Sequence, residues 1–202
     1  MNDLLTRRAV VAGMGVLGLG LLAGCSPARG LEFKYGKNMS NEILGRKFSL
    51  KDPQGNVRTL SSFYGSMPMV FFGFTQCPAV CPTTLARAAQ IRKLLRGRDR
   101  DLFQVVFITL DPERDTPEVL DAYVKAFDPT FTALTGTPEE IAAVAKEFKV
   151  FYEKVPTRTS YTMDHSAFTY LIDRKGRMRV VMRYAQSASE FTADVRALLA
   201  AG

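Results

Sequence analysis

Two stretches of the chain are almost continuously apolar, as buried central strands are. They are Met69–Phe74, "MVFFGF", and Leu102–Leu110, "LFQVVFITL". A strand that is covered on both faces needs apolar side chains at every position, whereas a half-exposed strand alternates. Alternating runs around turn residues predict two hairpins, one over Arg46–Phe63 and one formed by Ala167–Asp173 and Arg177–Tyr184.

Helical spacing of apolar residues fills the segments between these strands. Such spacing runs from Pro82 to Gly97, where the glycine is a stop signal. The sequence Thr-Pro-Glu begins at Thr116 and again at Thr137, and each time a capping threonine precedes a proline at the first helical position. These signals predict helices that end near Phe127 and Phe148, and a last helix covers 187–200.

The order of these elements predicts an α/β fold with a central mixed β-sheet flanked by helices and preceded by an N-terminal β-hairpin. It is the order of a thioredoxin-like fold. A hydrophobic content of 47% and a charged content of 23% suit an ordinary globular domain. We expect one such domain over residues 42–202.

The N-terminal segment has the pattern of an export signal. Arg7 and Arg8 precede an apolar stretch that is shorter than the ~20 residues of a membrane span and ends in "LLAGC". The cysteine at the predicted cleavage point resembles a bacterial lipobox. We therefore expect a signal peptide over residues 1–24, a lipidated Cys25, and a polar tether over residues 25–41. An uncleaved anchor is the alternative.

Export places the domain outside the cytoplasm, where disulfides persist. The formal net charge of +7 is moderate, and no basic run is dense enough to predict nucleic-acid binding. Basic residues do cluster over 92–100 and 173–183. These clusters are either solvated surface or a docking face for an acidic partner or an anionic membrane.

The candidate chemistry lies in "FGFTQCPAVCPTTL", which holds Cys77 and Cys81. The spacing fits a structural disulfide, a redox dithiol, or two thiolate ligands to one metal ion. The pair lies where the first buried strand leads into its helix, and a helix start favours the thiolate. Residues four apart on a helical turn have Cβ atoms about 5–6 Å apart, which suits two metal ligands better than a disulfide.

The chain contains a single histidine, His165, just before the predicted strand at 167–173. Two thiolates and one imidazole would favour copper, since sulfur ligands select Cu(I) and an imidazole also suits Cu(II). Zinc is disfavoured because a structural zinc site has four ligands. A carboxylate such as Asp164 would be needed as the fourth. A chance histidine on the surface or in the core is the remaining interpretation.

Three motifs in this order resemble the Sco family, also called SenC-type proteins, which are copper chaperones of cytochrome c oxidase assembly. They are "GFTQCPAVCPTTL", "LDPERDTPEVLDAYVKAFDP" and "MDHSAFTYLID". The resemblance implies one copper ion, Cu(I) or Cu(II), on Cys77, Cys81 and His165. It also implies delivery to the CuA centre in subunit II of the oxidase and exchange with other periplasmic copper carriers. The export signal and the lipobox predict a membrane-anchored lipoprotein on the periplasmic side, at the inner membrane.

The segment between the cysteines departs from the family pattern. Family members commonly carry an acidic residue there, where this chain has Ala79, so we expect the local charge, copper affinity and thiol potential to differ from the family's usual range. Asp164 either orients His165 or caps a turn, and Asp111 belongs either to a functional loop near the metal or to a simple turn.

The main competing function is a thiol–disulfide oxidoreductase. It would use Cys77 and Cys81 to reduce the CuA-site cysteines. His165 discriminates, because dithiol exchange does not need a histidine and copper coordination does. A peroxiredoxin-like peroxidase is disfavoured, since the cysteine spacing does not supply its motif.

Overall fold

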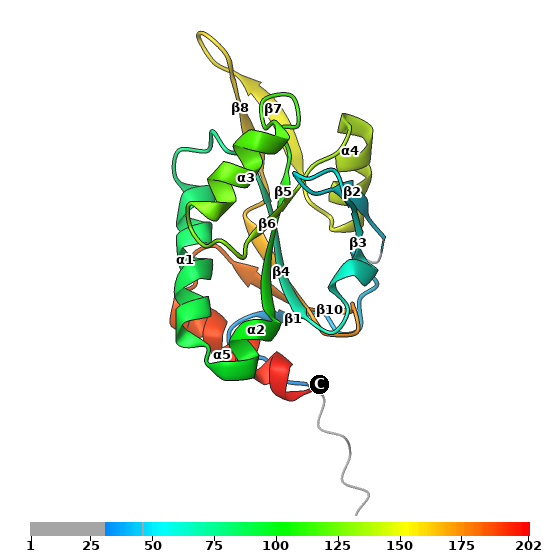
Figure 1. Ribbon diagram of the computed structural model, residues 1–202, viewed down its shortest axis with the longest axis vertical. Coiled ribbons are helices and arrows are strands. Elements are labelled where there is room, and N and C mark those ends of the chain that lie inside the picture. The colour runs from blue at the N-terminus through cyan, green and yellow to red at the C-terminus, as the bar shows by residue number, and fades with distance from the viewer. Residues whose placement is uncertain (1–30, 46) are drawn as a thin grey trace, which may run out of the picture. The chain divides into compact units, whose positions relative to one another are not determined.

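A mixed sheet forms the centre of the protein (Figure 1). The computed structural model describes residues 31–45 and 47–202, and within them six strands join in the order β1-β10-β9-β4-β5-β6. Strands β4, β5 and β6 are parallel to one another, whereas β9, β10 and β1 continue the sheet in antiparallel pairs. The bounds are Lys37–Asn38 for β1, Met67–Gly73 for β4, Phe103–Thr109 for β5, Thr132–Leu134 for β6, Phe168–Ile172 for β9 and Met178–Arg183 for β10.

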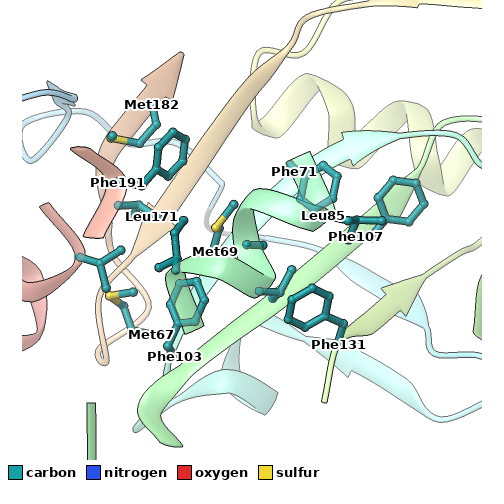
Figure 2. Packing of buried hydrophobic residues seen from close by; sticks show 14 of the residues in the cluster. Met67, Met69, Phe71, Leu85, Phe103, Phe107, Phe131, Leu171, Met182 and Phe191 are labelled. Atoms are coloured by element: carbon teal, nitrogen blue, oxygen red, sulfur yellow. The ribbon is translucent and has the colours of Figure 1, made fainter. Parts of the chain in front are cut away.

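The two continuous apolar runs are the central strands, as predicted. Every residue of β4 is buried, because both faces of the sheet are covered. Met67, Met69 and Phe71 point to one core, which Figure 2 shows packed with residues of the neighbouring helices. Val70 and Phe72 point to the other. The alternation of a strand thus divides the interior into two cores.

Helices cover both faces of this sheet (Figure 1). Residues of α1, α3 and α5 contribute to the first core, and residues of α4 and of the β2–β3 hairpin contribute to the second. The bounds are Val80–Leu94 for α1, Pro117–Lys125 for α3, Pro138–Glu147 for α4 and Ala188–Ala200 for α5. The hairpin pairs β2, Ser49–Lys51, with β3, Val57–Thr59, and a short 3-10 helix at Leu60–Phe63 follows. The predicted fold class, including the N-terminal hairpin, is confirmed.

Helices α3 and α4 begin at the capping threonines, as predicted. Thr116 accepts a hydrogen bond from the Val119 amide, and Thr137 forms a reciprocal capping box with Glu140. The predicted stop at Gly97 needs correction. Helix α1 already ends at Leu94, and Gly97, with a φ of 53°, begins the short helix α2, Gly97–Leu102.

The first part of the domain starts earlier than predicted. The carboxylate of Asp194 on α5 accepts hydrogen bonds from the backbone amides of Lys34, Tyr35 and Gly36, at 2.8, 3.0 and 2.6 Å. Strand β1 follows at once, and Met39 is buried. Residues 31–41 are therefore part of the fold rather than the end of a tether, because buried contacts hold them in place. Residues 1–24 and Cys25 lie outside the described residues.

The sequence did not predict the hairpin that β7 and β8 form beside the sheet. Strand β7, Tyr152–Pro156, pairs with β8, Tyr161–His165, and the pair projects at the top of Figure 1. No helix in the described part of the chain is long and apolar enough to cross a membrane.

Candidate metal centre

Both cysteines lie at the junction of β4 and α1. Cys77 sits in the connecting loop and is partly buried, whereas Cys81 is in the first turn of α1 and is 1% exposed. The Cys77 amide donates to the Phe74 carbonyl at 3.2 Å, and the Cys81 amide points at Cys77 Sγ at 3.5 Å. Both thiols are free. The loop therefore brings the two sulfur atoms to one point at the helix start.

Gly73 makes room for the Cys81 side chain. A Cβ atom at this position would lie 2.4 Å from Cys81 Sγ and 2.9 Å from Cε2 of Phe107. Contacts this short do not occur between unbonded atoms, so the backbone of β4 forms one wall of the thiol site.

The two thiols have opposite acidities. A hydrogen bond from the Cys81 side chain, followed by His165 and nearby backbone amides, lowers the pKa of Cys77 to about 3 against the opposing effect of burial. The same hydrogen bond and deep burial raise the pKa of Cys81 far above its usual range. These opposite shifts favour the thiolate at Cys77 and the protonated thiol at Cys81 at neutral pH.

The structure brings His165 to the same place from the end of β8. It lines a small pocket together with Cys81 and Phe168, and its ring also meets the edge of Phe74 at a centroid distance of 6.0 Å. Its Nδ1 lies 3.1 Å from the Ser166 carbonyl oxygen. Because a carbonyl only accepts hydrogen bonds, this contact assigns the proton to Nδ1 and leaves Nε2 as the nitrogen with a lone pair.

Cys77, Cys81 and His165 lie close to one another but do not form a complete metal site. Cys77 Sγ lies 3.5 Å from the Cys81 amide nitrogen, and Cys81 and His165 line the same small pocket. No set of three His, Cys, Asp or Glu side chains among residues 31–45 and 47–202 is already arranged to enclose a metal ion. The donor set of two sulfurs and one imidazole still fits copper chemically. To hold one metal ion together, the three side chains would have to shift from the positions they have here.

The two predicted supporting carboxylates lie in different surroundings. Asp164 is exposed and, as the neighbour of His165 in β8, it points to the opposite face of the strand. Asp111 is 1% exposed and accepts hydrogen bonds from Arg114 and from the Tyr161 hydroxyl. Asp111 thus belongs to the loop after β5, and it contacts the β7–β8 hairpin through the hydroxyl of Tyr161.

Sequence reasoning missed the residues that hold the cysteine loop. The buried carboxylate of Asp115 accepts hydrogen bonds from the amide and hydroxyl of Thr75 and from the hydroxyl of Thr109. Arg114 donates to Gln76, which directly precedes Cys77. The only sequence signal was the density of charges in "LDPERDTPE".

Comparison with known proteins decides the family. The SCO1/SenC family model matches residues 36–200. The chain belongs to the SCO1/SenC family. An SCO2-like protein of Rickettsia prowazekii is 39% identical over 172 residues, which cover 84% of this chain and 83% of that protein.

Solved structures of the SCO1/SenC family have the same fold. ScoI of Bradyrhizobium japonicum, determined with copper bound, has a TM-score of 0.69 and 37% identity, and the match covers 82% of this chain and 99% of that one. Apo Sco1 of Thermus thermophilus has a TM-score of 0.75 and 38% identity, with 84% and 99% covered. The fold expected from the Sco resemblance is confirmed.

Proposed function

We propose that this protein binds one copper ion through Cys77, Cys81 and His165 and delivers it to the CuA centre of cytochrome c oxidase. The observation that carries the proposal is the convergence of the chain's only histidine on the two cysteines from a separate hairpin. Family relatives with copper bound support the choice of metal.

The acidities of the two thiols suit copper binding. Cys77 is already a thiolate at neutral pH, so it binds a soft ion without first losing a proton. Cys81 must give up its proton, and a metal ion beside it supplies the positive charge that favours this. A site that holds Cu(I) by two thiolates and gains an imidazole for Cu(II) accommodates both oxidation states.

The place of action follows from the N-terminal pattern. Cleavage before Cys25 and lipidation would tether the domain on the periplasmic side of the inner membrane, where subunit II of the oxidase and other periplasmic copper carriers are the expected partners. A SCO1/SenC structure from Bacillus anthracis, 25% identical to this chain, is described as that of a lipoprotein.

The second candidate function is reduction of the CuA-site cysteines. The observation that favours it is the pair of opposite acidities, because a low-pKa Cys77 beside a protonated Cys81 is an attacking thiolate with a resolving thiol. Both functions use the same sulfurs, so a change at either cysteine does not separate them.

Replacement of His165 by alanine separates the two functions. In a copper carrier, Cu(II) binding should collapse while Cu(I) still binds to the cysteines more weakly, and CuA assembly should require added copper. Thiol–disulfide exchange should change little, since Cys81 remains the largest cause of the low pKa of Cys77. Full CuA assembly by the variant at limiting copper would overturn the copper proposal and favour the reductase.

A further inference from the structure

The hairpin that carries His165 is not hydrogen-bonded into the central sheet. In the part of the chain that the structure describes, β7 and β8 pair only with each other. The short connection from Ser166 to β9 and the contacts of side chains must therefore fix the hairpin relative to the cysteine loop. Figure 1 shows how far the hairpin extends from the sheet.

Arg114 contacts both sides of this junction. Its Nη1 donates to the side-chain oxygen of Gln76 at 3.2 Å and to the backbone carbonyl of Tyr161 at 2.8 Å. Its guanidinium carbon lies 3.7 Å from the centroid of the Tyr161 ring. Gln76 is adjacent to Cys77 and Tyr161 is the first residue of β8. One guanidinium thus joins the cysteine loop to the histidine strand.

The charge of Arg114 is held in place by a buried carboxylate. Asp111 is 1% exposed and forms an ion pair with Arg114 Nε, while its other oxygen accepts from the Tyr161 hydroxyl at 2.8 Å. Asp115, one residue after Arg114, anchors Thr75 on the cysteine side. The loop after β5 is therefore fastened to both partners, and a planar guanidinium is well suited to make the two bonds at fixed angles.

The register of β8 transmits this fixation to His165. Tyr161, Met163 and His165 lie at every second position of β8, so their side chains share one face of the strand. Met163 is 5% exposed and belongs to the second core. A strand held at Tyr161 and at Met163 can neither rotate nor slide freely, and the imidazole therefore faces the thiols.

We infer that Arg114 is a positioning residue, which sets how closely the imidazole of His165 can approach Cys77 and Cys81. The inference rests on the proposed function. Metal–ligand distances are tolerated within about 0.2 Å, so a small displacement of the hairpin removes the nitrogen ligand. The loop that carries Cys77 is held by Asp115 through Thr75, independently of the hairpin. Loss of Arg114 therefore affects Cu(II), which needs the imidazole, more than Cu(I).

The test is the Arg114→Gln variant of the full chain, titrated with Cu(II) and, anaerobically, with Cu(I) against competing chelators. Affinity for Cu(II) should fall about 10–100-fold, the usual effect of removing a group that orients a ligand. Affinity for Cu(I) should stay near that of the unaltered chain. Electron paramagnetic resonance of the Cu(II) form should lose nitrogen coupling, and the reduction potential of the cysteine pair should be unchanged.

Arg179→Gln is the matched control. Arg179 is 16% exposed, as Arg114 is, and it also pairs with a buried carboxylate, Asp173, but at the opposite end of the sheet. This control should lose a similar amount of stability, whereas the nitrogen coupling in the spectrum of its Cu(II) form should be unchanged. The double variant Asp111→Asn, Arg114→Gln removes the ion pair without leaving an unpaired buried charge. Arg114→Lys keeps the positive charge but removes the planar guanidinium.

The outcomes distinguish the inference from the proposed function. If the unaltered chain bound no copper, the proposed function would be wrong and the inference would fall with it. If the unaltered chain bound both ions and Arg114→Gln kept its affinity and its nitrogen coupling, only the inference would be wrong. The same holds if the double variant regained normal Cu(II) binding, since the unpaired carboxylate of Asp111 would then explain the defect of the single variant.

Discussion

A single methyl group at Gly73 should disturb the thiol site from the backbone side. In Gly73→Ala the new Cβ would stand 2.4 Å from Cys81 Sγ and 2.9 Å from the Phe107 ring. Unbonded heavy atoms prefer separations of about 3.5–4.0 Å, so the sulfur has to move by roughly 1 Å. The φ angle of Gly73 is not in the left-handed region, and the effect is therefore one of space alone.

The displacement has two measurable consequences. Extra volume in a well-packed core costs about 1–3 kcal/mol, and Cys81 and Phe107 are buried to within 1%. For a domain of this size 2 kcal/mol lowers the melting temperature by roughly 4–8 °C. The pKa of Cys77 should also rise, because its largest lowering cause is the hydrogen bond from Cys81. Affinity for Cu(I) should fall by about tenfold or more, equivalent to 1.4 kcal/mol.

The assay is the rate of alkylation of Cys77 against pH, measured by mass spectrometry alongside urea unfolding. The control is Gly136→Ala, where the new Cβ would lie 2.6 Å from a Glu140 oxygen and 2.9 Å from Leu50 in the second core. It should destabilise the fold without moving the alkylation profile. If Gly73→Ala had the profile and the Cu(I) affinity of the unaltered chain, the assignment of Gly73 as a wall of the site would be refuted.

Three further predictions concern the unaltered pair, the N-terminal clamp and the anchor. Cys77 should be alkylated as fast at pH 5 as at pH 8, because its pKa of about 3 keeps the thiolate populated until the pH approaches 3. Cys81 should not react, since its pKa is raised. An alkylation rate of Cys77 that fell with pH as for a free thiol would contradict this. Asp194→Asn should lower the free energy of unfolding by about 2 kcal/mol, since an amide cannot accept all three hydrogen bonds; a loss near zero would show that the clamp is unimportant. Cys25→Ser should release the protein from membranes or leave its signal uncleaved, and an unmodified Cys25 in the mature protein would refute lipidation.

Much of the fold is readable from the sequence because its signals are local. The runs at 69–74 and 102–110 are apolar throughout since both faces of the sheet are covered. Thr116 and Thr137 satisfy amides within their own first turns, so their roles need no distant partner. The thioredoxin-like order of strands and helices follows from these elements.

Segments whose structure depends on distant contacts were missed or misjudged. Residues 31–41 look like a polar linker, yet Asp194, about 160 positions away, binds their amides. Strand β7 is mostly exposed, so its composition lacks the alternation that would predict a strand. The pairing with β8 supplies its order instead.

The same division holds for the site. The sequence by itself determined the candidate ligands, since one cysteine pair at a helix start and a single histidine leave few choices. Only the tertiary structure decided that Cys77 is the low-pKa thiol and that the backbone of Gly73 packs against Cys81. It also decided that Arg114 joins Gln76 to Tyr161. The physical reason is distance along the chain. Residue types and short spacings record what a group can bind, whereas acidity, crowding and alignment come from atoms that only folding brings within a few ångströms.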